Sequence, residues 1–227
     1  MFKYKEAFMT RPPRDNSTRQ NQLIKDLEKE MKDNPNSVIA ALRLGMVYQN
    51  AERLEDAEIA FKHGLKFDPL SFETRLNLST LYFQMGRLED GITESKEALK
   101  IRPESTDVMS NIGAAYIHMQ RWEYAAEYFN KAIEIKPEMI TALANLVTVN
   151  VELDKLESAI AAGKKAVSLA PRFGVAHNNL AVAYYYQGDY DLALDHLEKA
   201  KKIGYAVSPQ FEEMVSAKAE SQTGEAS

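Results

Sequence analysis

Residues 106–139 read TDVMSNIGAAYIHMQRWEYAAEYFNKAIEIKPEM, and this stretch contains the pattern that decides the fold. Apolar residues recur three or four positions apart in its first half and again in its second half. Such spacing is typical of helices, because residues three and four apart lie on one helix face. Pro137 follows the second half and blocks continuation of that helix. The stretch therefore predicts two helices joined by a short turn.

The same pattern returns at a fixed interval along the chain. Five prolines are each 34 residues apart: Pro35, Pro69, Pro103, Pro137 and Pro171. A constant interval of this length indicates an internal repeat. With proline at position 32, the chain contains repeat 1 (38–71), repeat 2 (72–105), repeat 3 (106–139), repeat 4 (140–173) and repeat 5 (174–207). Two helices per repeat account for every repeat without strands, so we predict an all-α fold.

The residues at fixed positions of the repeat resemble the tetratricopeptide repeat (TPR). In repeat 3 the resemblance rests on positions 7, 8, 11, 20, 24, 27 and 32, which are Ile112, Gly113, Tyr116, Ala125, Phe129, Ala132 and Pro137. Repeat 4 departs most, with Asn150 in place of the tyrosine and Gly163 in place of the aromatic residue. The resemblance implies a right-handed α-solenoid of about five and a half 34-residue helix–turn–helix repeats.

The segment before the repeats is predicted to cap them. Residues 20–37 match the second helix of a repeat whose first helix is missing, so we expect a half-repeat cap there. Ahead of it lies an N-terminal arm, residues 1–19, which contains aromatic residues and the Pro12-Pro13 pair. This arm is either a frayed terminus or a segment that docks on the protein itself or on a second copy.

The segment after the repeats is also predicted to be a cap. Ser208-Pro209 is typical of a helix start. We expect a capping helix over 208–219, followed by a disordered tail over 220–227. Terminal repeats need such covers because their apolar faces otherwise meet water. The residues expected to cover repeat 5 are Phe211, Met214 and Val215.

Composition excludes several classes of protein. The chain has 227 residues with a net charge of −5, which disfavours nucleic acid as a partner. It has no cysteine, and therefore neither disulfides nor a thiolate zinc site. No apolar run is long enough to span a membrane, and the first residues do not form a signal peptide. We accordingly expect a cytoplasmic protein.

Catalytic signatures are also missing from the sequence. The four histidines occupy different positions of the repeat, and His177, at position 4, is expected to be a packed core residue. No nucleophile–base pair or pair of catalytic carboxylates emerges. We therefore expect no enzyme activity, no cofactor and no metal.

One helix face is the candidate binding surface. Positions 2, 6, 9 and 13 of the first helix lie opposite its core face, and the resemblance implies that ligands lie on this face, in a concave groove. Position 6 is occupied by Arg43, Asn77, Asn111, Asn145 and Asn179. An asparagine amide offers both a donor and an acceptor, which suits an extended peptide backbone. An equally good interpretation is that these asparagines have no binding role and are merely polar residues tolerated on a solvated helix face.

Apolar residues are expected beside this column. Position 12 carries Phe83, Ile117, Val151 and Tyr185, and Tyr186 follows at position 13 of repeat 5. These residues favour a peptide recognised by shape rather than by charge. Asp107 and Asn111 stand where the cations of a carboxylate-gripping TPR domain belong, which makes that mode of binding a poor fit.

The sequence thus favours a non-catalytic scaffold that binds an extended or helical peptide segment of a partner protein in the groove. Two alternatives remain open. The first is a self-associating assembly protein, a homo-oligomer formed through the N-terminal arm or the caps. The second is an accessory subunit of an enzyme complex.

Overall fold

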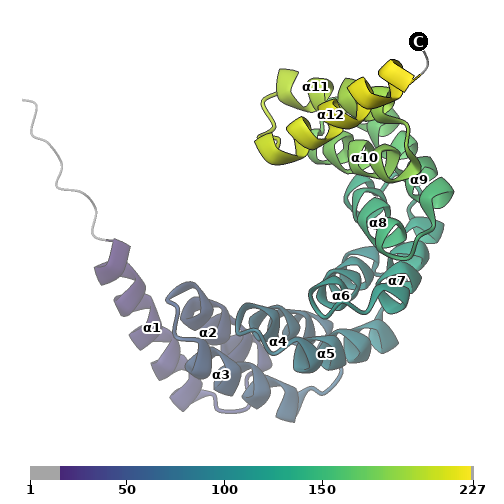
Figure 1. The fold of residues 1–227 in the computed structure, drawn as a ribbon. Helices are drawn as coiled ribbons and strands as arrows, with labels where there is room; N and C mark the ends of the chain where they lie inside the picture. The colour runs from purple at the N-terminus through teal and green to yellow at the C-terminus, as the bar shows by residue number, and fades with distance from the viewer. Residues whose placement is uncertain (1–15, 226–227) are drawn as a thin grey trace, which may run out of the picture. The chain divides into compact units, whose positions relative to one another are not determined.

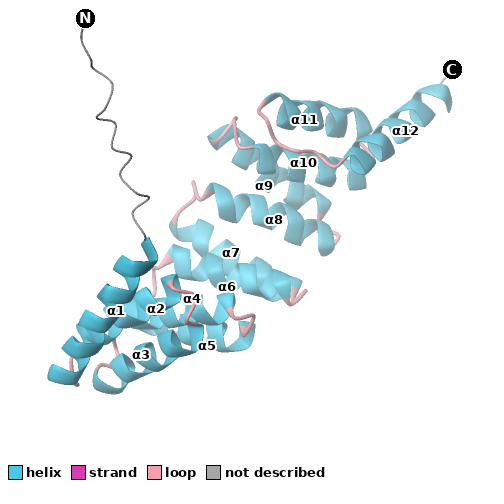
Figure 2. Cartoon of the chain, turned by 90° about the vertical axis from the view of Figure 1, so that its left-hand side faces the viewer, coloured by secondary structure: helices cyan, strands magenta, loops and turns pink. Residues whose placement is uncertain are grey.

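The computed structural model describes residues 16–225, and this part of the chain folds into helices and loops without a strand (Figure 2). The helices are α1 (Asn16–Asp33), α2 (Val38–Asn50), α3 (Leu54–Phe67), α4 (Phe72–Gln84), α5 (Leu88–Ile101), α6 (Thr106–His118), α7 (Trp122–Ile135), α8 (Ile140–Glu152), α9 (Leu156–Leu169), α10 (Gly174–Gln187), α11 (Tyr190–Lys202) and α12 (Pro209–Glu225). The predicted all-α solenoid of two-helix repeats is confirmed. The N-terminal arm as far as residue 15 lies outside the described residues.

Contacts divide the chain into two compact units, with the boundary between Glu94 and Ser95 inside α5. The N-terminal unit contains α1 to α4 and the first part of α5. The C-terminal unit contains the rest of α5 and α6 to α12. Within the C-terminal unit, α6, α8 and α10 form one layer and α7, α9 and α11 the other (Figure 1).

The turn inside each repeat is left-handed at position 15. Glycine occupies it in repeats 2 and 5, where Gly86 and Gly188 have φ angles of 73° and 89°. The other three repeats place a residue with a side chain there, with φ between 54° and 58°: Glu52, Gln120 and Asp154. Because such residues enter this region at a cost, the connection between the two helices, and not the residue type, imposes the conformation.

In repeats 1 and 3, the two helices meet through a glycine and an aromatic ring. A Cβ atom on Gly45 would lie 2.4 Å from the Phe61 ring, and one on Gly113 would lie 2.9 Å from the Phe129 ring. Both rings are fully buried. Glycine at position 8 therefore admits the aromatic side chain of position 24.

Repeat 2 makes this contact in the opposite direction. Its position 24 is Ser95, and the aromatic ring is instead Phe83 of α4, which lies against Gly91 of α5 at 2.4 Å from where a Cβ atom would stand. We expected Phe83 to flank the groove, and that prediction is wrong. Position 12 follows position 8 by one helical turn and so faces the second helix of its own repeat.

In every repeat except repeat 4, a tyrosine at position 11 contacts the helix before it. Tyr48 Oη donates to Glu28 Oε1 (2.7 Å) on α1, and Tyr82 Oη donates to Glu58 Oε1 (3.0 Å) on α3. Burial, followed by the Glu28 carboxylate, raises the pKa of Tyr48 to about 12. The hydroxyls of both tyrosines therefore remain protonated donors at neutral pH.

A lysine at position 25 of the preceding repeat lies over the tyrosine ring in three cases. The distances from Nζ to the ring centroid are 5.9 Å for Lys62 and Tyr82, 5.7 Å for Lys96 and Tyr116, and 5.8 Å for Lys164 and Tyr184. Lys96 Nζ also donates to Tyr116 Oη (3.1 Å). Where position 11 is Asn150, the preceding position 25 is Asn130, so both partners of the pair change together.

The two caps differ in detail from their expected bounds. The N-terminal cap α1 begins at Asn16 and packs on α2 through Ile24 and Leu27, whereas Leu23, which the repeat pattern places in the core, is exposed. Two serines that precede first helices act as N-caps: Ser37 Oγ accepts from Ala40 N (3.2 Å) and Ser71 Oγ accepts from Thr74 N (3.4 Å). Ser105 occupies the same place without a side-chain cap bond.

The C-terminal cap α12 runs to Glu225, so the tail expected to be disordered from residue 220 is helical as far as the structure describes it. Val215 is fully buried in the core of repeat 5, and Phe211 packs at its edge. Met214 is 46% exposed, contrary to our prediction. The covering face consists of Phe211, Val215 and Ala219, which are four residues apart and share one side of the helix.

Replacing Val215 with serine should destabilise the C-terminal unit by about 2 kcal/mol, the value of burying a valine side chain. The same substitution at Met214 serves as the control and should leave the melting temperature nearly unchanged. Thermal denaturation followed by circular dichroism measures both. Equal effects of the two substitutions would contradict the covering face.

Replacing Ser95 with alanine should stabilise the protein. Ser95 is fully buried and its hydroxyl has no hydrogen-bond partner among the described residues, and an unsatisfied buried group costs about 1–3 kcal/mol. Ser79 is the control, because it is equally buried but its hydroxyl donates to Leu76 O (2.8 Å). Urea denaturation should show a gain for Ser95→Ala only. A loss of stability for Ser95→Ala would contradict this account.

Candidate functional site

The position 6 residues lie on the exposed face of the first helices. In the C-terminal unit, α8 contacts both α6 and α10, so their position 6 residues follow one another across this layer. Asn111 on α6 is exposed and Asn145 on α8 is half-buried. Neither amide has a hydrogen-bond partner within residues 16–225. Both amides therefore remain available to a ligand.

Asn179 of the same column has a structural role. Its Nδ2 donates to Ala144 O (3.0 Å) and to Thr148 Oγ1 (3.3 Å), both on α8. The side chain thus connects α10 to the preceding first helix, and its NH₂ group is used within the protein. The carbonyl oxygen of the amide is the part left for a ligand.

In the N-terminal unit the column is engaged differently. Asn77 Nδ2 donates to Glu73 O (2.7 Å), one turn earlier in α4. Arg43 of α2 forms an ion pair with Glu30 of α1 (3.2 Å), between two exposed side chains. The predicted column of five therefore contains two free amides, two amides with occupied NH₂ groups and one paired arginine.

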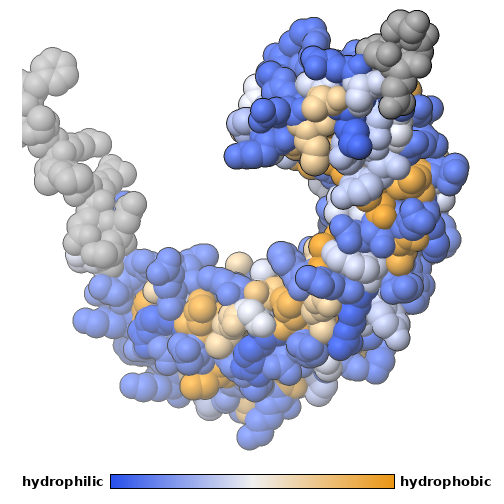
Figure 3. Space-filling view, in the orientation of Figure 1, coloured by the Kyte–Doolittle hydropathy of each residue, from blue (hydrophilic) through white to orange (hydrophobic). Residues whose placement is uncertain are grey.

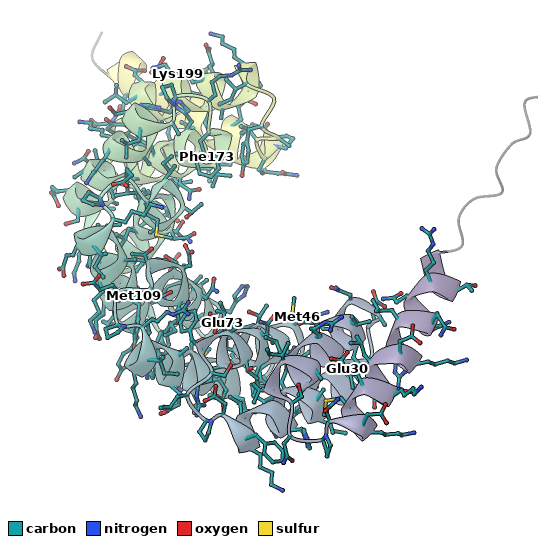
Figure 4. All side chains as sticks on the ribbon, turned by 180° about the vertical axis from the view of Figure 1, so that it is seen from behind. Glu30, Met46, Glu73, Met109, Phe173 and Lys199 are labelled. Atoms are coloured by element: carbon teal, nitrogen blue, oxygen red, sulfur yellow. The ribbon has the colours of Figure 1, made fainter. Side chains whose placement is uncertain are left out.

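Apolar side chains also reach the surface of the N-terminal unit. Ile39 of α2 is 69% exposed, and Met46 is exposed on the same helix. Figure 4 shows Met46 of α2 and Glu73 of α4 next to each other along one edge of this unit. Figure 3 shows apolar residues interrupting the hydrophilic surface over α2 and α4.

The position 12 residues of the C-terminal unit are placed mainly by the core. Val151 and Tyr185 pack at the edge of the same hydrophobic cluster, and Ile117 is half-buried. The Tyr185 ring meets Phe211 of α12 edge-on at 5.6 Å. That these residues flank the groove remains a prediction, because each of these side chains is only half-buried by packing. Tyr186, at position 13, is 62% exposed and is the tyrosine presented to solvent.

Two histidines meet in repeat 5, which the sequence analysis missed. His177 on α10 is buried, as predicted, but its Nδ1 lies 2.9 Å from Nδ1 of His196 on α11. Burial, and after it the neighbouring Lys199 and His177, lowers the pKa of His196 to about 4. The sequence did contain a clue to this contact. His177 and His196 occupy positions 4 and 23 of repeat 5, and the same positions of repeat 2 hold the oppositely charged pair Arg75 and Glu94.

Membrane-spanning helices and metal sites bear on function. Within residues 16–225, none of the helices is both long and apolar enough to cross a membrane. The described side chains contain no group of three or more histidines and carboxylates placed to hold a metal ion.

The fold and this surface define a helical-repeat protein, and the family follows from comparison with known sequences. Two family models described as tetratricopeptide repeat match the chain, one over residues 106–139 and 174–203, the other over 40–69 and 72–105. These ranges together cover more than half of the chain, which therefore belongs to the tetratricopeptide repeat family. Repeat 4, the most divergent, lies outside them. A comparison with curated proteins gave no match.

Solved structures share the fold. A crystal structure of MamA is 26% identical, with a TM-score of 0.67, and the match covers 70% of this chain and 94% of that one. YrrB, described as a TPR protein with an unusual peptide-binding site, is 18% identical, with a TM-score of 0.69 and coverage of 86% and 97%. A tetratricopeptide repeat protein from Parabacteroides merdae is 18% identical, with a TM-score of 0.71 and coverage of 89% and 84%.

Alanine substitutions at two asparagines of the column should have different effects on the stability of the protein. Asn179→Ala removes the hydrogen bonds to α8 and should cost about 1–2 kcal/mol. Asn111→Ala removes none and should change stability by less than about 0.5 kcal/mol. Urea denaturation measures both variants. An unchanged stability of Asn179→Ala would show that its bonds to α8 contribute nothing in solution.

Proposed function

We propose that this protein is a non-catalytic scaffold that holds an extended or helical peptide segment of a partner protein on the exposed face of α6, α8 and α10. Tetratricopeptide repeat proteins generally mediate interactions between proteins, and YrrB, which has the same fold, has a peptide-binding site. The observation that carries the proposal is the pair of unengaged amides of Asn111 and Asn145 at one position of neighbouring repeats.

The spacing of these amides suits an extended backbone. Packed helices lie about 8–10 Å apart, and an extended chain advances about 3.3 Å per residue. One asparagine therefore meets a peptide every third residue. Its Nδ2 donates to a backbone carbonyl and its Oδ1 accepts from a backbone N–H.

The amides alone do not account for a stable complex. Each pair contributes about 0.5–1.5 kcal/mol net, whereas a micromolar complex requires about 8 kcal/mol. Apolar contacts must supply the remainder. Because Val151 and Tyr185 pack against the core, we assign this contribution to the exposed Tyr186, with the half-buried Val182 of α10 beside it. Tyrosine is a frequent anchor of protein interfaces.

The test uses peptides selected on the folded protein from a random display library. Asn111 and Asn145 are replaced together with alanine, and the affinity for the selected peptides is measured by calorimetry. We expect binding to weaken about ten- to a hundredfold, with an unchanged melting temperature because neither side chain bonds within the protein. The contrary outcome uses peptides whose binding is weakened by Tyr186→Ala. If the Asn111/Asn145 double variant binds these peptides with unchanged affinity, the asparagines are merely tolerated polar residues.

Self-association is measured on the same samples. Light scattering over a range of concentrations reports the oligomeric state of the wild-type protein and of the double variant. A mass that rises with concentration and falls in the double variant would show that this face binds a second copy of the chain. A constant monomeric mass together with peptide binding supports the scaffold.

A further inference from the structure

The C-terminal unit has a pocket away from the asparagine face. It lies between the second helices α9 and α11, with α10 between them, and has a volume of about 500 Å³. We call it the α9–α11 pocket. Its apolar lining includes Val167, Leu180, Tyr184 and Ile203. A pocket of this volume accommodates a small molecule.

The hydrogen bonds of the two histidines determine which ring nitrogens carry protons. His177 Nε2 lies 3.1 Å from Pro171 O, and a carbonyl oxygen only accepts, so Nε2 of His177 is the donor. In the neutral ring its Nδ1 then accepts from Nδ1–H of His196. His196 therefore has an unprotonated Nε2, which has no partner among the described residues and belongs to a ring that lines the pocket.

Repeat 2 shows what the same two positions do in a conventional repeat. Arg75 Nε donates to Pro69 O (2.9 Å), just as His177 does to Pro171 O, and its Nη1 is paired with Glu94. In that pair the positive charge of Arg75 is balanced by the negative charge of Glu94. The histidine pair keeps the bond to the preceding loop but replaces the ion pair with a neutral ring that offers one free acceptor.

The remaining polar groups of the pocket are mainly cationic. Lys164, Lys199 and Lys202 line it, and no carboxylate of the described part of the chain does. Lys199 and Lys202 pair with Asp195 and Glu198, each four residues earlier in α11, and all four side chains are exposed. Lys199 appears on α11 in Figure 4. Exposed pairs of this kind are weak, so an anion in the pocket can recruit both ammonium groups.

A second, smaller hollow marks one end of the cationic region. It shares Lys164 and Tyr184 with the α9–α11 pocket but is lined by Glu157 and Asp189. An anionic group is therefore favoured on one side of Lys164 and disfavoured on the other.

We propose that the α9–α11 pocket binds a small organic phosphomonoester, with its phosphate among Lys164, Lys199 and His196 and its apolar group against Val167, Leu180 and Ile203. A phosphomonoester loses its second proton near pH 6, so near neutral pH part of it carries one P–O–H group. This group donates to Nε2 of His196 while the other oxygens accept from the lysines. A carboxylate at neutral pH has only acceptor oxygens. It cannot donate to Nε2 of His196, so the lone pair of that nitrogen would face another lone pair.

The protonation of His196 is coupled to this ligand. The groups that face it are Lys164 from α9, His177 and Tyr184 from α10, and Asp195 and Lys199 from α11. Burial, and after it the charges of Lys199 and His177, holds the pKa of His196 near 4, against the opposing effect of Asp195. The folded protein thus binds fewer protons than the unfolded chain between about pH 4 and pH 6.5, and its stability falls as the pH drops through that window. A bound phosphate supplies the opposing charge and raises the pKa of His196.

Phenyl phosphate is the probe, titrated into the full chain by calorimetry and by NMR of the histidine side chains. We expect one binding site, tighter binding at pH 6 than at pH 8, and a rise of the His196 pKa on saturation. Inorganic phosphate lacks the apolar group and benzoate lacks the O–H donor, so both should bind at least about tenfold more weakly. Benzoate binding as tightly as phenyl phosphate would overturn the proposal.

Matched lysines provide the control for charge. Lys199 and Lys131 both occupy position 26 and both pair with a carboxylate four residues earlier. Lys199→Gln should weaken phenyl phosphate about tenfold or more, whereas Lys131→Gln should have no effect. Equal weakening by the two substitutions would mean that phenyl phosphate responds only to the overall surface charge. Absence of binding at millimolar phenyl phosphate would also contradict the proposal.

A double variant tests the histidines without removing the bond between helix and loop. His177→Arg with His196→Glu reproduces the Arg75–Glu94 pair of repeat 2, so the protein should remain folded by circular dichroism. The added carboxylate should abolish binding of phenyl phosphate. Retained binding in this folded variant would exclude His196 from the site.

Discussion

The contact between the position 11 tyrosine and the preceding second helix joins repeats 1, 2, 3 and 5 to the helix before them. A two-helix repeat cannot bury its apolar surface alone and must pack on a neighbour. Tyr48, Tyr82 and Tyr184 are buried at such junctions, each beside a charged residue of the helix before it. The ring supplies apolar area, and the hydroxyl or the ring face meets a charged side chain of the preceding helix: Glu28, Glu58 or Lys164.

Departures from the repeat pattern are compensated by neighbouring residues. In repeat 2 the aromatic ring comes from Phe83, because Gly91 on the facing helix leaves room for it. In repeat 4 the aromatic residue of position 24 is replaced by Gly163, and Leu180 of the next repeat lies 2.8 Å from where its Cβ atom would stand. The core thus keeps its packing density while the residue that fills each space changes. Within residues 16–225, Ser95 is the exception, since its buried hydroxyl has no hydrogen-bond partner there.

The C-terminal repeats carry different chemistry on their two layers. The first helices present neutral amides and Tyr186, which suits a peptide backbone. The second helices enclose a pocket with lysines and a histidine acceptor, which suits a small anion. Both arise from the same repeat geometry, because each helix has one face in the core and leaves the other to solvent.

The sequence by itself determined the repeat length, the all-α class, the helix pairs and most of the core, because these follow from periodic apolar residues and from proline and glycine at fixed positions. It also located the asparagine column. Only the tertiary structure decided which of those amides are free, since Asn179 bonds across to α8 while Asn111 does not. The tertiary structure also brings His177 and His196 together and places the Phe83 ring against Gly91. Such contacts join residues on different helices, and their geometry depends on how closely the helices approach, which no single helical period specifies.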